Sequence, residues 1–307
     1  MFLKGKEKCT RMVLELKDIN KSFGENHVLK DVSFSAQSGK AFGLLGRNGA
    51  GKTTTIRILM NVFSADSGSI FIDGEPIDRR KIGIGYLPEE RGLYPKKVII
   101  DQLAYFAELK GMKRKAAIES IDNWLVRLDM MEYRNKKLST LSKGNQQKIQ
   151  LITALAHNPD IVILDEPFSG LDPVNAIMLK EVVREEIAKG KIVLFSSHQM
   201  SYIEEFCDSI AIINAGKVVL SGDLFDIKRN YIRDKLVVNT LYPEPIKEAF
   251  GDACTEIARG ELIIKLASPD EKDSVMQRIV EKYDIDGIKV FEPSLNDIFV
   301  EYTEERV

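Results

Sequence analysis

The segment Gly46-Arg-Asn-Gly-Ala-Gly-Lys-Thr53 follows the pattern Gly-x-x-x-x-Gly-Lys-[Ser/Thr], and it decides how the rest of the chain is interpreted. Glycines at these positions let backbone N–H groups close around a polyphosphate, and the dipole of a following helix favours the negative charge. Lys52 would then reach the terminal phosphates, while the Thr53 hydroxyl would bind Mg²⁺. The alternative is a glycine-rich turn that only joins a strand to a helix.

The residues on either side of this loop favour phosphate binding over a plain turn. Residues 40–46 form a short apolar run typical of a strand, and residues 53–62 have the periodicity of a helix. Further upstream, apolar and polar residues tend to alternate over residues 13–34, with turn residues at 24–27. The sequence therefore predicts a small antiparallel β-layer, then a strand, a phosphate loop and a helix of an α/β fold.

Downstream of the loop, three helix-like segments follow one another without an intervening strand, at residues 101–109, 115–128 and 146–156. They predict a helical subdomain, about residues 97–158, inserted into the α/β core. Two apolar runs, 161–164 and 192–195, then predict buried parallel strands, and residues 217–220 predict an edge strand.

Beyond residue 222 the character of the sequence changes. Strand-like runs at 235–239, 262–266 and 289–291 alternate with helix-like stretches, which predicts a small βαββαβ arrangement. We therefore predict three parts, namely an N-terminal extension at 1–11, a main α/β domain at 12–222 and a small α+β C-terminal domain at 223–307.

Two carboxylates follow the predicted buried strand, at the position where ligands bind in an open α/β sheet. Asp165 suits Mg²⁺ through a water molecule, and Glu166 could polarise a water for attack on the γ-phosphate. His198 likewise follows the second buried strand. The alternatives are a polar strand end that begins a turn at Pro167 and, for His198, a hydrogen-bonded surface histidine.

A further polar segment, Leu141-Ser-Lys-Gly-Asn-Gln146, directly precedes a predicted helix. Ser142 and Gly144 offer a hydroxyl and backbone N–H groups that could bind an anion at the start of that helix. A simple helix cap is the alternative.

Composition limits the remaining possibilities. With 44 Lys and Arg against 46 Asp and Glu, the 307-residue chain has no overall attraction to nucleic acid or anionic lipid. Its three cysteines, Cys9, Cys207 and Cys254, lie far apart in the sequence, and none forms a Cys-x-x-Cys pair of the kind that binds zinc. This pattern favours a reducing, cytoplasmic location. The longest apolar runs fall far short of the roughly 20 residues that span a bilayer.

Taken together, these motifs resemble those of the ABC ATPase family. The phosphate loop, the Leu-Ser-x-Gly segment, Ile163-Leu-Asp-Glu-Pro167, Ser169-Gly-Leu-Asp172 and Ser196-Ser-His198 occur in that family's order and approximate spacing. The resemblance covers about residues 12–223 and looks closest to subunits of sodium- and drug-export systems. It implies a P-loop NTPase cassette with a mixed sheet core, an antiparallel β-subdomain and an inserted helical subdomain.

The resemblance also implies roles for individual residues. Glu166 is the catalytic base, His198 senses the γ-phosphate and Lys52 binds it, while Asp172 belongs to a loop linking two sites across a dimer. Metal ligands are Thr53, Glu89 and Asp165. The nucleotide contacts are Phe23, which stacks on adenine, the loop residues Gly46, Arg47, Asn48, Gly49, Ala50, Gly51, Lys52, Thr53 and Thr54, and the signature residues Ser142, Gly144 and Gln146.

Two positions depart from the family pattern. The signature has Lys143 and Asn145 where two adjacent glycines and then Gln are usual, so the place of Gln146 depends on the alignment. Glu89 stands where Gln is normal, and its charge beside a triphosphate should alter metal affinity. For Phe23, an aromatic residue buried in the core is the alternative to stacking.

The function implied is ATP hydrolysis, with ATP and Mg²⁺, by a subunit of a transporter, and the resemblance to export systems favours an exporter. Two subunits, in a homodimer or heterodimer, would enclose two nucleotides head to tail. The loop at residues 89–94 would contact an integral membrane permease on a separate chain, at the inner face of the cell membrane. No nucleic acid is expected. The alternatives are a soluble ABC-type ATPase acting on nucleic acid or the ribosome, and a regulatory subunit that binds nucleotide without cleaving it.

Overall fold

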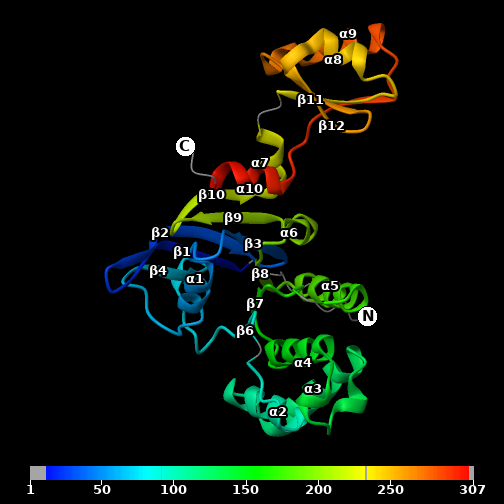
Figure 1. The fold of residues 1–307 in the computed structure, drawn as a ribbon. Coiled ribbons are helices and arrows are strands. Elements are labelled where there is room, and N and C mark those ends of the chain that lie inside the picture. Colours follow the sequence, from blue (N-terminus) through cyan, green and yellow to red (C-terminus); the bar gives the residue numbers. More distant parts are fainter. Residues whose placement is uncertain (1–11, 91, 170, 232–233, 304–307) are drawn as a thin grey trace, which may run out of the picture. The chain divides into compact units, whose positions relative to one another are not determined.

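The computed structural model describes residues 12–90, 92–169, 171–231 and 234–303 (Figure 1). The predicted N-terminal extension and Cys9 lie outside the described residues. The described residues divide into two compact units, one holding those up to Leu224 together with those from Phe299, and the other holding those of Phe225–Ile298. The domain boundary drawn after residue 222 from the sequence stays a prediction.

A six-stranded sheet forms the centre of the first unit, in the order β10-β9-β3-β8-β7-β6. All neighbouring pairs in it are parallel except β9 and the edge strand β10. Every residue of β7 and β8 is buried, which explains their continuous apolar sequence and confirms the predicted parallel strands. The strands are β3 (Lys40–Leu45), β6 (Ile84–Leu87), β7 (Ile161–Asp165), β8 (Ile192–Ser196), β9 (Ser209–Asn214) and β10 (Lys217–Asp223).

A second, antiparallel sheet in the order β2-β1-β4-β5 confirms the predicted β-layer. Its alternating apolar residues, such as Leu14 and Leu16, pack with those of the central sheet and of helix α1 (Lys52–Leu59) in one core cluster. Helix α1 ends earlier than residue 62, the predicted end, because Asn61 has a left-handed backbone conformation. The strands are β1 (Val13–Phe23), β2 (Asn26–Gln37), β4 (Ser67–Ile72) and β5 (Glu75–Pro76).

The helical subdomain lies between β6 and β7 in the chain, as predicted. Its helices are α2 (Ile99–Leu109), α3 (Arg114–Arg127) and α4 (Lys143–Leu155), with short 3₁₀ turns at Met131–Tyr133 and Leu138–Thr140. Helix α4 begins three residues before the predicted start, because the Ser142 side chain caps it by accepting a hydrogen bond from the Asn145 N–H.

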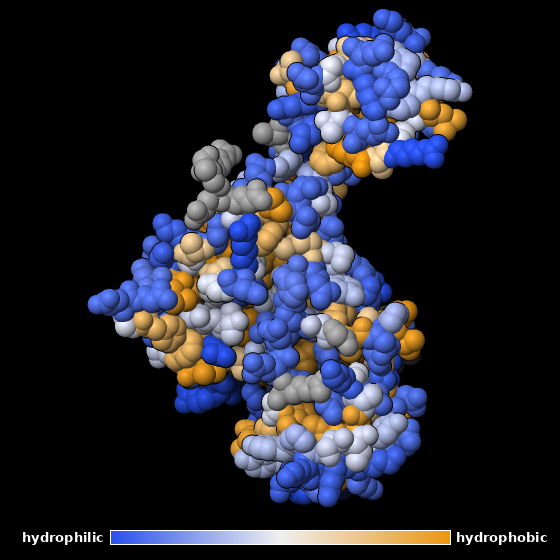
Figure 2. Space-filling view, viewed as in Figure 1, coloured by the Kyte–Doolittle hydropathy of each residue, from blue (hydrophilic) through white to orange (hydrophobic). Residues whose placement is uncertain are grey.

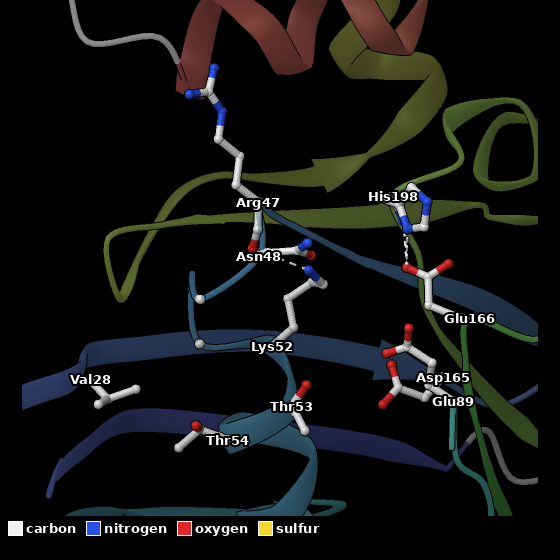
Figure 3. A pocket seen from close by; sticks show the side chains of 12 residues that line it. Val28, Arg47, Asn48, Lys52, Thr53, Thr54, Glu89, Asp165, Glu166 and His198 are labelled. Atoms are coloured by element: carbon white, nitrogen blue, oxygen red, sulfur yellow. Dashed lines mark hydrogen bonds and ion pairs between the residues drawn. The ribbon is translucent and has the colours of Figure 1, made fainter. Parts of the chain in front are cut away.

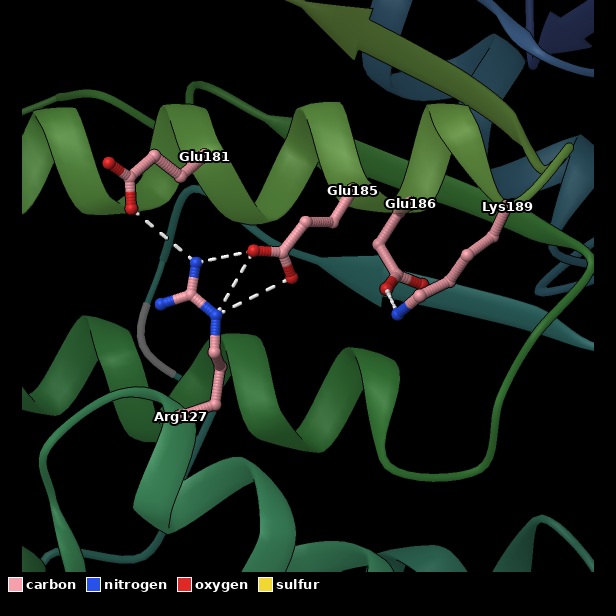
Figure 4. Close-up of polar contacts among 5 residues, drawn as sticks. All are labelled: Arg127, Glu181, Glu185, Glu186 and Lys189. Carbon is pink, nitrogen blue, oxygen red and sulfur yellow. Dashed lines mark hydrogen bonds and ion pairs between the residues drawn. The ribbon is translucent and has the colours of Figure 1, made fainter.

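Ion pairs join this subdomain to helix α5 (Pro173–Ala188), which follows β7 (Figure 4). The Arg127 guanidinium at the end of α3 lies 2.5 Å from a Glu185 oxygen and 3.4 Å from a Glu181 oxygen. The short helix α6 (Met200–Phe206) lies between β8 and β9 in the chain.

The second unit has the predicted βαββαβ order, with all neighbouring strands antiparallel and in the order β12-β13-β11-β14. It has its own core, which includes Leu236, Val238, Leu262 and Ile264. Edge strand β12 is largely exposed, so its sequence lacks the apolar run by which strands were predicted. The elements are β11 (Lys235–Asn239), α8 (Glu244–Phe250), β12 (Cys254–Ala258), β13 (Glu261–Lys265), α9 (Lys272–Lys282) and β14 (Gly287–Val290). In the chain, α7 (Leu224–Asn230) precedes them, and α10 (Leu295–Thr303), whose residues from Phe299 belong to the first unit, follows them.

Within the described ranges, none of the helices combines the length and the apolar character needed to cross a membrane.

Candidate functional site

A pocket of about 330 Å³ lies at the carboxyl ends of the central parallel strands (Figure 3). The loop between β3 and α1 forms one side, and residues that end or follow β6, β7 and β8 form the other. The lining residues are Val28, Arg47, Asn48, Gly49, Gly51, Lys52, Thr53, Thr54, Glu89, Asp165, Glu166 and His198. The fold thus brings together residues that lie up to 170 positions apart in the sequence.

The phosphate loop needs glycine at the positions where its backbone turns. Gly49 and Gly51 have φ angles of +80° and +116°, which residues with a side chain rarely adopt. A Cβ at Gly51 would also lie 2.6 Å from the Leu29 side chain, and one at Gly46 would lie 2.6 Å from the Ile213 carbonyl oxygen. Gly46 and the buried Ala50 shape the loop from behind rather than line the pocket.

The ammonium group of Lys52 is held over this loop. Its Nζ donates to the carbonyl oxygens of Gly46 at 2.6 Å and Arg47 at 3.3 Å. Burial lowers the pKa of Lys52, an effect that the negative charges of Glu166, Asp165 and Glu89 oppose. A partly desolvated ammonium beside backbone N–H groups at a helix start is a site that favours an anionic phosphate.

Asp165 is the last residue of β7, and its carboxylate is 5% exposed. Burial raises the pKa of Asp165, and the nearby Ser196 hydroxyl and the hydrogen bond from Tyr86 partly offset that increase. A nearby cation would stabilise the ionised form of such a buried carboxylate, and a metal ion bound to it would do so.

Glu166 is held in a strained backbone conformation with φ of +48°. Its carboxylate accepts hydrogen bonds from the His198 backbone N–H at 2.9 Å and from the Ser197 hydroxyl at 3.0 Å. The Nδ1 atom of His198 lies 2.6 Å from the same Glu166 oxygen, Oε1, that accepts from the backbone. The turn after β7 and the turn after β8 therefore fix one carboxylate at the pocket wall.

The residues present fit a Mg²⁺ ion bound together with a nucleotide. Thr53, Glu89 and Asp165 all line the pocket and offer oxygen atoms, the ligands that this hard cation prefers. In the described part of the chain, no three His, Cys, Asp or Glu side chains form a metal cage. Mg²⁺ in such sites usually takes one or two carboxylates and completes its shell with phosphate oxygens and water, so no closed cage is needed.

Four predicted contact residues lie elsewhere. The ring of Phe23 is 49% exposed and packs edge to face on Phe63, with 5.3 Å between ring centroids, so it is not a core residue. Ser142 caps α4, and the Gln146 side-chain amide donates to the carbonyl of Leu141 at 3.0 Å. Gly144 and both of these residues lie outside the pocket of their own chain.

Sequence reasoning missed Val28, Tyr86 and Ser197. Val28 is an apolar residue in a strand, and such residues carry no chemical signature. Tyr86 and Ser197 reach the acidic residues through the pairing of β6, β7 and β8, and the spacing of a motif does not reveal strand pairing.

Comparisons with known proteins agree with this geometry. Residues 29–169 match the family model for the ABC transporter, and residues 222–303 match that for the C-terminal domain of DrrA1-3-like ATP-binding proteins. The chain is 41% identical over 292 residues to YhaQ of Bacillus subtilis (strain 168), an uncharacterized ABC transporter ATP-binding protein, covering 94% of this chain and 98% of YhaQ. It is 30% identical to the linearmycin resistance ATP-binding protein LnrL of the same organism, covering 95% and 98% of the two chains. A solved structure of the ATP-binding subunit of an ABC transporter superposes with a TM-score of 0.65 at 32% identity, covering 71% of this chain and 93% of that one.

Proposed function

The chain belongs to the family of ABC transporter ATP-binding proteins, which bind and hydrolyse ATP, and from this premise we propose that it drives export through a separate membrane permease. Export is the direction that fits a relative named for resistance to linearmycin and similar over almost its whole length. The small unit that follows the cassette, matched to the domain of DrrA1-3-like proteins, supports the same proposal.

The observation that carries the enzymatic part is the pair formed by Glu166 and His198 opposite Lys52 in one pocket (Figure 3). We propose that the amides of the phosphate loop and Lys52 hold the γ-phosphate. Glu166, the base, accepts a proton from the attacking water, and His198 keeps the carboxylate oriented. Mg²⁺, bound through Thr53, Asp165 and Glu89, would neutralise charge on the phosphate oxygens.

A second subunit would complete this site. Ser142, Gly144 and Gln146 lie outside the pocket of their own chain, so they can serve a nucleotide only from a partner. Gly144 lies close to Asp172, the N-cap of α5, and to Asn175 in the first turn of that helix, so the signature lies beside the loop predicted to link two sites. We propose a head-to-tail dimer, with a copy of this chain or a related subunit, in which each signature meets the other subunit's ATP.

The permease contact is proposed for the loop after β6 and the adjoining helical subdomain, at the inner face of the cell membrane. Figure 2 shows hydrophobic residues gathered over parts of this subdomain. Large exposed apolar side chains there include Tyr94, Tyr105 and Leu109. Contiguous exposed apolar surface is typical of a binding site, and the loop starts at Glu89, so movement there would reach the pocket directly.

Reconstitution with a permease tests the proposal. The purified chain would be combined in proteoliposomes with a polytopic membrane protein encoded beside it, and ATPase activity and substrate movement would be measured. We expect the permease to stimulate hydrolysis, and transport to run from the ATP-containing side to the opposite side. Lys52→Ala, which removes the phosphate contact, should abolish both. Transport toward the ATP-containing side would refute export, and ATPase activity unaffected by any such permease would refute the coupling.

A further inference from the structure

Two side chains with hydroxyl groups flank Asp165 in the central sheet, and neither belongs to the predicted site. Strand β7, which ends at Asp165, lies between β6 and β8. The register pairs Asp165 with Ser196 of β8, so the two side chains lie on the same face of the sheet. Tyr86 of β6 pairs with Ile163, two residues before Asp165, and therefore shares that face.

Tyr86 is anchored at both ends. Its ring packs against the core cluster that contains Ile163 and the residues of α1, and its hydroxyl donates to Oδ2 of Asp165 at 3.2 Å. A tyrosine with a buried ring and a bonded hydroxyl has little freedom to move. With Oδ2 held in this way, the Asp165 carboxylate cannot turn freely about its Cβ–Cγ bond.

Ser196 lies beside Asp165 on β8, the strand on the other side of β7. Its side chain is 1% exposed, and within the described residues its Oγ makes no hydrogen bond of ordinary geometry. A buried hydroxyl without a partner is unfavourable, so it calls for an explanation. Ser196 pairs with Asp165 in the register of β7 and β8, so this hydroxyl lies on the same face of the sheet as the carboxylate.

We infer that Tyr86 is a positioning residue for the metal-bound nucleotide, with Ser196 as a second support. Tyr86 fixes the orientation in which Asp165 presents its carboxylate to the pocket. The ring makes the packing contacts with the core, so the hydroxyl serves to orient the carboxylate and not to pack. The inference rests on the proposed assignment of Mg²⁺ to Asp165.

The test compares the wild-type full-length chain with Tyr86→Phe, which keeps the ring and removes only the hydroxyl. Binding of Mn²⁺ in the presence of a non-hydrolysable ATP analogue would be followed by electron paramagnetic resonance. Binding of the analogue without metal, in EDTA, would be measured by calorimetry. Tyr133→Phe, in the helical subdomain, is the matched control because it removes the same hydroxyl from a tyrosine that does not line the pocket.

We expect Tyr86→Phe to weaken Mn²⁺ binding about tenfold, the scale of one hydrogen bond to a charged group, and to leave metal-free nucleotide affinity unchanged. Ser196→Ala should weaken Mn²⁺ binding in the same direction and by less. Equal Mn²⁺ affinity in Tyr86→Phe and wild type would overturn the positioning role alone. If Tyr86→Phe lost nucleotide affinity equally with and without metal, its role would be purely structural, and the positioning role would again be overturned. If the wild-type chain bound no metal–nucleotide, both this inference and the proposed metal site would fail.

Discussion

Replacing Ser197 with Ala should slow ATP hydrolysis without weakening ATP binding. Ser197 is 3% exposed, and its hydroxyl donates to Oε2 of Glu166 at 3.0 Å. The other oxygen, Oε1, is contacted by His198. Loss of Ser197 Oγ would leave one end of the catalytic carboxylate without its protein donor, so the carboxylate could rotate away from the attacking water.

The size of the effect follows from the kind of bond that is lost. A hydrogen bond to a charged group contributes about 1.5–3 kcal/mol, and two donors to Glu166 remain, so we expect the lower end of that range. At about 1.4 kcal/mol for each factor of ten, kcat should fall by roughly tenfold, while KM for ATP changes by less than about twofold.

Steady-state phosphate release from the purified chain is the assay, with thermal unfolding to confirm that the variant folds. Ser197→Thr keeps a hydroxyl and should restore most of the activity. Ser274→Ala, which removes a hydroxyl on α9 of the second unit, should be silent. If Ser197→Ala turned over ATP at the wild-type rate, the argument that this hydroxyl orients Glu166 would be wrong.

Three further predictions concern the loop, the adenine contact and acid stability. Gly51→Ala should lower the thermal stability and the ATP affinity measured by calorimetry. The reason is that φ at this residue is +116° and an added Cβ would lie 2.6 Å from the Leu29 side chain. Unchanged stability and affinity would contradict the need for glycine at this position. Phe23→Ala should weaken ATP binding by about 0.5–1.5 kcal/mol without affecting inorganic triphosphate, and an equal effect on both ligands would exclude stacking. His157 is mostly buried with a pKa lowered to about 4 by burial, so the fold favours its neutral form. The stability that this group contributes is complete above about pH 6.5 and is lost as the pH falls toward 4. Because His157 is partly exposed, we expect the free energy of unfolding to fall by about 1–2 kcal/mol between pH 7 and pH 4.5 on its account. Urea unfolding at the two pH values measures this loss, which should be absent in His157→Gln.

The phosphate loop and the two buried strands could be predicted because their chemistry is local. Glycine spacing and continuous apolar runs are properties of the sequence itself, and the fold reproduces the strands within a residue or two. The helical insertion was also predictable from periodicity. The start of α4 was not, because Ser142 extends the helix by a cap over three residues with no apolar face.

The rest of the site depends on pairing between strands that lie far apart in the sequence. Tyr86, Asp165 and Ser196 meet because β6, β7 and β8 are neighbours in a specific register. The strained turn at Glu166 likewise depends on its hydrogen bond to the Ser196 carbonyl of β8. Spacing along the chain carries no information about register, so these supporting residues could be found only in the folded structure.

In the proposed reaction, Glu166 promotes cleavage of a triphosphate held by the loop around Lys52. The most direct measurement is the rate of ATP hydrolysis by Glu166→Gln beside its affinity for ATP and Mg²⁺, measured by calorimetry. We expect a rate at least about 100-fold lower with an affinity within a few-fold of wild type. A variant that binds ATP normally and hydrolyses it at the wild-type rate would contradict the proposed role of Glu166.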